Sequence, residues 1–289
     1  MSALHTQIEP SPVSPALNVT LEVRVCRTWT EMEQFGQDWN CLLQASPPAS
    51  IFQTPEWLGA WWHAFGAQKE LLALIFIDST NKTVAIAPFY VEQRRSFGVP
   101  MRVLRMVGAG SGDSDALDFI TAPGWERDCA VAFVSWLARE STWHICSLET
   151  LPHDSLTAQH IARLVRENGW PLHSETSPNF FVELPPSWPE YLDGLEPGFR
   201  PLLTRYPKRL QSRYRVGMVR CERVKHLDDN LETLFNLHQM RWTDQGEPGA
   251  FSSAERRDFY FRMAHAFEER NLAVVSVVDP NAEIDFARV

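Results

Sequence analysis

The stretch that decides the fold is LLALIFIDSTNKTVAIAPFYV, residues 71–91. Two apolar runs, Leu71–Ile77 and Thr83–Val91, flank a polar turn at Asp78–Lys82 that contains Asn81. Apolar runs of this length on either side of turn residues predict a buried antiparallel pair of strands. A pair buried in this way needs cover, which predicts a mixed sheet with helices on both faces.

The sequence before and after this pair supplies the remaining elements of that sheet. A strand is predicted at Leu21–Arg27, where apolar and polar residues alternate. Helical spacing or helix caps predict helices over 30–43, 55–65, 124–139 and 155–168. Further strands are predicted over 101–107, 116–120, 144–148, 170–175 and 180–184.

The second half of the chain begins again after the proline-rich segment ELPPSWPEY. We predict a basic helix from Pro207, a helix over 228–242, and a helix to Glu269 that starts with a capping box at Ser252–Glu255. Strands are predicted over 216–224, 272–278 and 282–289. This order repeats the architecture of the first half, so we expect a lead-in over 1–19, one α/β domain over 20–184, a linker over 185–198 and a second domain over 199–289.

Composition excludes several classes of protein. No window approaches 18 apolar residues, so no membrane span is expected, and the N-terminus lacks the cationic start of a secretory signal. The five cysteines are widely spaced and form no CxxC, which argues against structural zinc and a disulfide framework and favours a reducing cytoplasm. We expect no metal.

Charge is distributed unevenly along the chain. The formal net charge is −9, which argues against wholesale binding of nucleic acid or anionic membranes. Residues 200–225 nevertheless carry nine basic side chains and one acid, which leaves −17 on the rest of the chain. In a helix from Pro207, one arc of about 160° can form either a solvated face or a clamp for phosphate or carboxylate groups. It contains Lys208, Arg209, Ser212, Arg213 and Arg215.

Two further patterns suggest sites of chemistry. Arg105-Met-Val-Gly108-Ala-Gly110 has the R-x-x-G-x-G form of a pyrophosphate loop, but acidic residues and no helix follow it, which favours a turn between strands. His238 lies in the middle of the apolar face of the helix over 228–242, with Arg241 and Trp242 close by. It is either a hydrogen-bonded core residue or a proton acceptor in a cleft that a mobile loop after Trp242 covers.

Six segments together resemble a known family. They are FQTPEWLGAWWHAFG (52–66), VAIAPFY (84–90), SDALDFI (114–120), Pro123-Gly124, LETLP (148–152) and LHQMRW with GAF (237–251). In this order they resemble the GNAT-type acyltransferases associated with cellulose biosynthesis, the CelD-like family with a BioF2-like acetyltransferase domain, which is related to FemAB-type transferases. The resemblance runs from about residue 20 to residue 278.

This resemblance implies two tandem GNAT-like domains, the first degenerate and the second incomplete because its C-terminal part is missing. It implies acetyl-CoA or another acyl-CoA as co-substrate and an amine or hydroxyl acceptor, a small molecule or a glycan precursor in exopolysaccharide production. His238 is the candidate proton acceptor. Arg205, Lys208, Arg209, Arg213, Arg241 and Trp242 are the candidate binding residues for substrate or cofactor.

Two other functions stay open. A chain that lacks the end of the second domain can be an inactive acyltransferase that serves as a binding module, with its 200–225 segment on an anionic partner. A FemAB-like aminoacyl transferase would use the same segment on tRNA phosphates, although no RNA- or DNA-binding motif accompanies it.

Overall fold

The computed structural model describes residues 21–46, 50–140, 143–180, 182–213, 218–220, 227–270 and 276–278. These residues fall into two compact units. Unit 1 contains residues up to 58 and 68–172, and unit 2 contains 59–67 and the residues from 173 onward. The predicted lead-in over 1–19 and the predicted strand over 282–289 lie outside the described residues.

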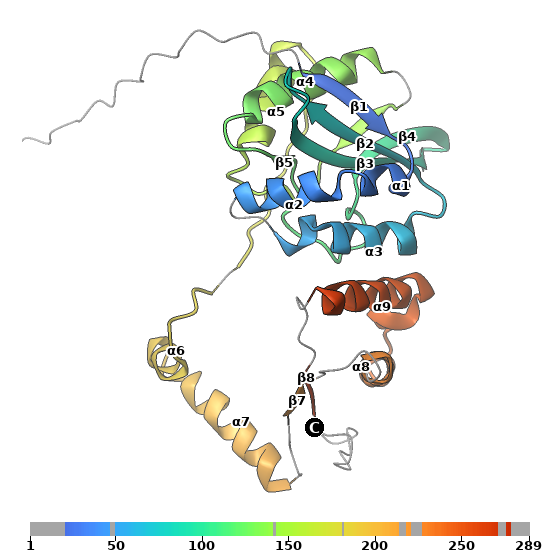
Figure 1. Cartoon of the computed structure of the whole chain (residues 1–289). Coiled ribbons are helices and arrows are strands. Elements are labelled where there is room, and N and C mark those ends of the chain that lie inside the picture. The colour runs from blue at the N-terminus through green and yellow to red at the C-terminus, as the bar shows by residue number, and fades with distance from the viewer. Residues whose placement is uncertain are drawn as a thin grey trace, which may run out of the picture. The chain divides into compact units, whose positions relative to one another are not determined.

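Unit 1 is built on a six-stranded sheet with the order β1-β2-β3-β4-β6, and β5 pairs with β3 (Figure 1). Helix α2 and the packed pair of helices α4 and α5 flank this sheet. The strands are β1 (Glu22–Cys26), β2 (Glu70–Ile77), β3 (Thr83–Ser96), β4 (Val99–Met106), β5 (Ile120–Thr121) and β6 (Ile145–Ser147). The helices are α1 (Trp29–Glu33), α2 (Gly36–Ala45), the short η1 (Ile51–Gln53), α4 (Glu126–Arg139) and α5 (Leu156–Glu167). Helix α3 (Pro55–Phe65) begins in unit 1, and its residues from Gly59 onward belong to unit 2.

The predicted strand pair is the centre of this sheet. Strand β2 runs antiparallel to β3, with Ile75 opposite Ile86, and nearly every residue of the two apolar runs is buried. The turn between them is held by Asp78, whose Oδ1 accepts hydrogen bonds from the backbone N–H groups of Thr80 and Lys82. Asn81 has a φ of 63°, a conformation that asparagine tolerates better than most residues.

Strand β4 is antiparallel to β3 on one side and parallel to β6 on the other, where Leu104 lies opposite Cys146. Parallel neighbours need a long connection, and here it contains a glycine-rich loop, β5 and α4. The connection is anchored by three buried rings, Phe89, Phe119 and Phe133, whose centroids lie 5.0–5.6 Å apart. The mixed sheet predicted for the first half is therefore present in unit 1.

Three predictions for the first half are wrong. Of the segment predicted as a strand over 116–120, only Ile120 lies in a strand, β5. The helix predicted over 30–43 is two helices, because Thr28 and Glu31 form a capping box for α1 and the chain leaves helical geometry at Phe35, before Gly36 starts α2. The segments predicted as strands over 170–175 and 180–184 contain no strand in their described residues. They include Pro171, they are exposed, and the sheet offers them no neighbour.

Unit 2 contains a small helical core and a two-stranded sheet. Its elements are α6 (Trp188–Gly194), α7 (Arg200–Arg213), β7 (Met218–Arg220), α8 (Leu227–Thr243), η3 (Ala250–Ser252), α9 (Ala254–Glu269) and β8 (Ser276–Val278). Strands β7 and β8 are antiparallel. The core of α8, η3 and α9 consists of Leu227, Leu231, Phe235, Phe251 and Ala264, with Tyr260 and Phe261 against it.

Three details of unit 2 differ from the sequence prediction. Helix α7 starts at Arg200, well before Pro207, so that this proline lies inside the helix. The N-cap of α9 is Ser253, which accepts a hydrogen bond from the backbone of Arg256, whereas Ser252 donates to Gly249. The predicted capping box is therefore absent, because the third residue after Ser253 is Arg256 rather than a Glu or Gln. The predicted linker over 185–198 contains a helix, α6.

Candidate functional site

The candidate cations of the sequence analysis lie on α7, and all of them are exposed. Arg205, Lys208, Arg209 and Arg213 have no ion pair within the described part of the chain. Arg200, at the start of the helix, is instead held by Asp193, with Nη1 3.3 Å from the Asp193 carboxylate. No acidic residue occurs within α7. Four positive charges on one short helix therefore stay available to an anionic group.

His238 lies on α8 against an aromatic cluster. Its ring meets the ring of Phe251 nearly at a right angle, with centroids 4.9 Å apart, and lies 5.9 Å from the ring of Trp242. The Nδ1 atom is buried and has no hydrogen-bond partner among the residues described. His238 is thus partly buried and in contact with aromatic rings, but it lacks the hydrogen bond expected of a core histidine.

The loop after Trp242, which the sequence predicts to be a mobile cover, is tied to α8. The side-chain amide of Gln239 donates to the carbonyl of Pro248 at 2.6 Å, and the backbone N–H of Glu247 donates to the carbonyl of Trp242 at 2.9 Å. At Gly249, with φ at 71°, a Cβ atom would lie 2.4 Å from Gln239 Oε1. The positive φ favours glycine at this position, and the loop that it begins places Phe251 beside His238.

The structure brings some of the predicted site residues together and leaves others apart. His238 and Trp242 share the aromatic cluster of α8, and Arg241 and Trp242 are exposed beside it. Within the described residues, no hydrogen bond, ion pair or ring contact joins the four α7 cations to α8. The candidate residues therefore form two sets, an aromatic one around His238 and a cationic one on α7.

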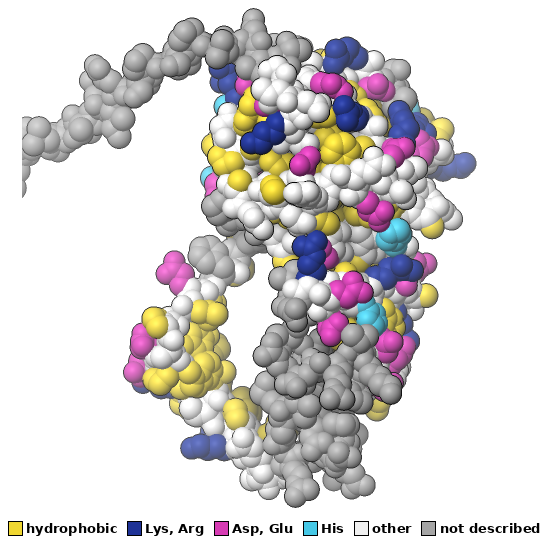
Figure 2. All heavy atoms as spheres, viewed as in Figure 1, with side chains coloured by type: hydrophobic (Ala, Val, Ile, Leu, Met, Phe, Trp, Pro, Cys, Tyr) yellow, Lys and Arg dark blue, Asp and Glu magenta, His cyan; other side chains and the backbone are white. Residues whose placement is uncertain are grey.

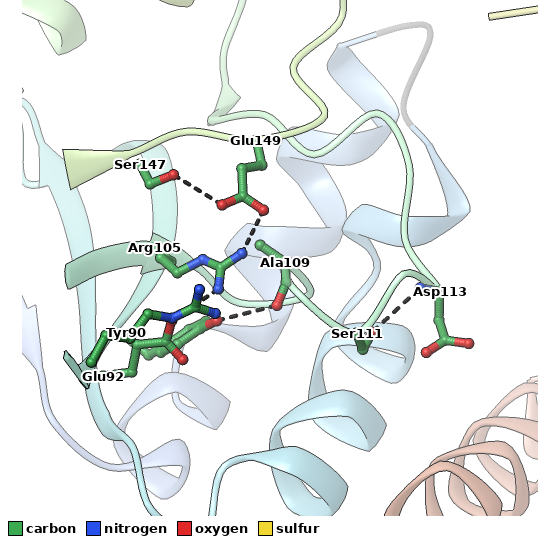
Figure 3. Close-up of polar contacts among 9 residues, drawn as sticks. Tyr90, Glu92, Arg105, Ala109, Ser111, Asp113, Ser147 and Glu149 are labelled. Carbon is green, nitrogen blue, oxygen red and sulfur yellow. Dashed lines mark hydrogen bonds and ion pairs between the residues drawn. The ribbon is translucent and has the colours of Figure 1, made fainter. Parts of the chain in front are cut away.

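The R-x-x-G-x-G segment of unit 1 is a turn, as its context favours. It follows β4, and the next regular element is β5 rather than a helix. Arg105 does not face outward to meet a phosphate: its side chain is 6% exposed and lies between two carboxylates (Figure 3). Its Nη1 donates to Glu92 at 2.9 Å and its Nη2 donates to Glu149 at 2.5 Å.

This buried ion-pair cluster, Arg105 with Glu92 and Glu149, fixes the glycine-rich loop. Tyr90 donates its hydroxyl to the carbonyl of Ala109 at 3.1 Å, and Ser147 donates to Glu149 at 2.9 Å (Figure 3). Burial works against the charge of Arg105, but the hydrogen bonds that Arg105 donates to Glu92 and Glu149 outweigh this effect and raise the pKa of the guanidinium. Burial also raises the pKa of Tyr90, so its phenol stays neutral and donates.

Sequence reasoning missed the role of Arg105 because its partners give no local signal. Glu92 comes from β3 and Glu149 follows β6, and only the pairing of β4 with both strands brings the three side chains together. The cluster is structural, since both carboxylates are engaged by the cation they surround. No group of three or more His, Cys, Asp or Glu side chains gathers as a metal site in the part of the chain that the structure describes.

Among models of known protein families, one matches the second half of the chain. Residues 199–284 match the acetyltransferase (GNAT) domain. Acyl-CoA is the co-substrate of GNAT acetyltransferases, and the match includes α7, α8 and α9. This match agrees with the acetyltransferase domain predicted over 199–289. The cellulose-associated family, two tandem GNAT units and the predicted domain boundaries stay predictions.

Several solved structures show similarity to the chain at low identity. An aminoglycoside antibiotic 6'-N-acetyltransferase from Acinetobacter baumannii is 12% identical, with 57% of this chain and 99% of that chain covered and a TM-score of 0.32. An aminoglycoside acetyltransferase from an uncultured soil metagenomic sample is 10% identical, with 57% and 97% covered and a TM-score of 0.33. The BH1408 protein from Bacillus halodurans is 13% identical, with 56% and 99% covered and a TM-score of 0.31. No curated protein matches.

In the described residues, no helix combines the length and the apolar character that crossing a bilayer demands.

Proposed function

We propose that the chain transfers an acetyl or other acyl group from acyl-CoA to an amine or hydroxyl acceptor. The observation that carries the proposal is the match of residues 199–284 to the acetyltransferase domain. The resemblance of the six sequence segments supports a glycan precursor in cellulose or other exopolysaccharide production as the acceptor.

The chemistry on α7 fits the donor. Coenzyme A carries phosphate groups, and Arg205, Lys208, Arg209 and Arg213 are exposed cations without ion pairs among the described residues. Guanidinium groups bind phosphate oxygens with two parallel hydrogen bonds, which gives both affinity and orientation. These residues would therefore hold the phosphates, and Arg241 would contribute a further positive charge.

His238 is the proposed proton acceptor. In the reaction, the acceptor nitrogen or oxygen attacks the thioester carbonyl carbon, the C–S bond breaks, coenzyme A leaves as the thiolate, and the acceptor gives up a proton. In the tautomer with its proton on Nε2, the unpaired Nδ1 offers a lone pair for that proton. Because Nδ1 is buried beside Phe251, the loop over 246–251 has to open for the transfer to occur.

Calorimetry and a thiol-release assay with acetyl-CoA test this function. We expect acetyl-CoA to bind, Arg209→Gln with Arg213→Gln to weaken binding, and His238→Gln to lower kcat by about a hundredfold without a change in affinity. His265→Gln is the matched control, because His265 lies on α9 and pairs with Asp228 at 2.6 Å. If the unaltered chain binds no acetyl-CoA, it is not an acyltransferase.

The exposure of the α7 cations also favours a second candidate function, a binding module without catalysis. In this case the 200–225 segment holds an anionic partner, and binding weakens steeply as salt rises. Substitution of Arg209 and Arg213 by Glu should abolish binding to a polyanion such as heparin. Unchanged binding would rule out this function, and binding of tRNA at low salt would favour aminoacyl transfer instead.

A further inference from the structure

Helix α7 and the residue before it carry an apolar stripe that faces solvent. Its members are spaced i, i+3, i+4, i+7 and i+11, which places them on one side of a helix. They are Phe199, Leu202, Leu203, Tyr206 and Leu210. Phe199 is 60% exposed, Tyr206 is 58% exposed, and Leu202 and Leu203 are each 37% exposed. An uncovered stripe of this size on a soluble helix marks an interaction surface.

Helix α6 extends this apolar surface. The ring of Trp188, which is 58% exposed, stacks on the ring of Tyr191 with centroids 5.3 Å apart. Arg200 links the two helices, since it donates to the carbonyl of Asp193 at 2.8 Å. Figure 2 shows hydrophobic side chains gathered over α6 and α7. The two helices thus present one surface rich in aromatic residues.

Most of the charged side chains of α7 lie next to the stripe. At 100° per residue, Arg209, Arg205 and Lys208 follow Leu202 at about 20°, 60° and 120°, and Arg213 falls within the stripe, between Leu202 and Tyr206. The helix carries five cations and no acid. A polar face rich in Lys and Arg beside a face of Phe, Leu and Tyr is the pattern of a helix that lies in a bilayer interface.

We propose that α6 and α7 bind the surface of an anionic lipid bilayer. The stripe enters the boundary between headgroups and acyl chains, Trp188 and Tyr206 lie at headgroup depth, and the cations meet the lipid phosphates and carboxylates. Charge complementarity selects this occupant: a polyphosphate would satisfy the cations but leave the stripe in water. A second copy of α7 would cover the stripe but bring five like charges together.

Sedimentation with vesicles tests the proposal on the full chain. We expect binding to phosphatidylcholine vesicles that contain about 30% phosphatidylserine, little binding to pure phosphatidylcholine, and weaker binding at high salt. The double variant Phe199→Ser with Leu203→Ser should bind at least about tenfold more weakly. Phe97→Ser is the matched control, because it removes an exposed ring at the β3–β4 turn of unit 1 and should bind as the unaltered chain does.

The same variant separates this proposal from the proposed function. Both use the α7 cations, but only membrane binding needs the stripe, so the variant should keep its affinity for acetyl-CoA. No binding of the unaltered chain to anionic vesicles overturns the proposal. A fall of several degrees in Tm for the variant also overturns it, because the stripe would then be packed inside the protein. Equal binding of the variant and the unaltered chain to anionic vesicles would also overturn the proposal.

Discussion

Arg105 holds its charge inside the protein with the help of two carboxylates. Its side chain is 6% exposed and that of Glu92 is 14% exposed, so the pair is shielded from water. Arg102, three residues earlier on β4, pairs with Glu70, but that carboxylate is 57% exposed. The two arginines thus form the same kind of ion pair with glutamate on one strand, one shielded from water and the other exposed to it.

We predict that Arg105→Met lowers the free energy of unfolding by up to about 3–5 kcal/mol, because it removes the buried cation from Glu92 and leaves that carboxylate only Arg94, which is 58% exposed. Arg102→Met is the control and should cost less than about 1 kcal/mol, as exposed pairs do. Urea unfolding followed by circular dichroism measures both values. Similar losses for the two variants would show that the Arg105 cluster is not a special feature of the fold.

Asp118 is the residue whose ionisation should affect stability in weakly acidic solution. Burial raises its pKa from 3.8 to about 6, although hydrogen bonds from Ser155 and from the backbone of Phe119 oppose this. The folded chain therefore binds this proton more tightly than the unfolded chain does, and stability falls as pH rises through the window between the two pKa values.

We predict that Asp118→Asn gains stability relative to the unaltered chain between pH 4 and pH 7, by on the order of 2–3 kcal/mol. The comparison between variant and unaltered chain cancels the opposite trend of Glu70 and Glu92, whose pKa values are lowered. Urea unfolding at several pH values provides the measurement. A difference that does not change with pH would mean that Asp118 ionises normally in the folded chain.

At the scale of elements, the glycine-rich loop after β4 depends on two different properties of glycine. Gly110 and Gly112 both have positive φ, 89° and 79°. A Cβ atom on Gly110 would lie 2.9 Å from Nη1 of Arg105, whereas nothing lies within 4 Å of the corresponding position on Gly112. Since two carboxylates hold the guanidinium, it cannot move aside cheaply.

We predict that Gly110→Ala destabilises the chain more than Gly112→Ala. Both variants incur the backbone strain of about 1–2 kcal/mol, and only Gly110→Ala adds the clash with Arg105. Thermal unfolding of the two variants measures the difference. If the two Tm values agree, the loop is free to shift away from the ion-pair cluster.

The elements that sequence predicted well are those with local signals. Thr54 and Pro55 mark the start of α3, Ser155 caps α5, and the apolar runs at 71–77 and 83–91 form β2 and β3. The sequence patterns failed where the structure of a segment depends on a neighbouring strand or on a helix cap. The segments over 170–175 and 180–184 alternate like strands but find no neighbour, and the helix over 30–43 breaks where a cap and Gly36 outweigh its periodicity.

The candidate site was predictable only in part for the same reason. Residue types and spacing identified His238 and the α7 cations. The contact of His238 with Phe251 depends on the Gly249 turn, and the Arg105 cluster depends on strand pairing over long distances. Neither can be read from spacing along the chain.

At the scale of the whole molecule, an irregular stretch of chain begins where the last segment of unit 1 ends. Leu172 is the last residue of unit 1. Residues 173–180 and 182–186 contain no helix or strand and are mainly exposed. Irregular exposed backbone is the preferred site of proteolysis.

We predict that a Glu-specific protease cuts the folded chain first after Glu175 or Glu183. Glu167, which is also exposed but lies in the last turn of α5, is the internal control and should be cut later. Mass spectrometry of the first fragments identifies the site. First cleavage within a helix or strand of either unit would contradict the prediction.

The parallel pairing of β4 with β6 has a consequence during synthesis of the chain. Strands β2, β3 and β4 follow one another through short turns and can pair as soon as they leave the ribosome. The outer edge of β4 has to wait until Ile145–Ser147 has been made, since those residues are its partner. During that interval the nascent protein exposes an unpaired strand edge. Binding by chaperones or aggregation at this stage would therefore depend on how quickly α4 folds and β6 pairs with β4.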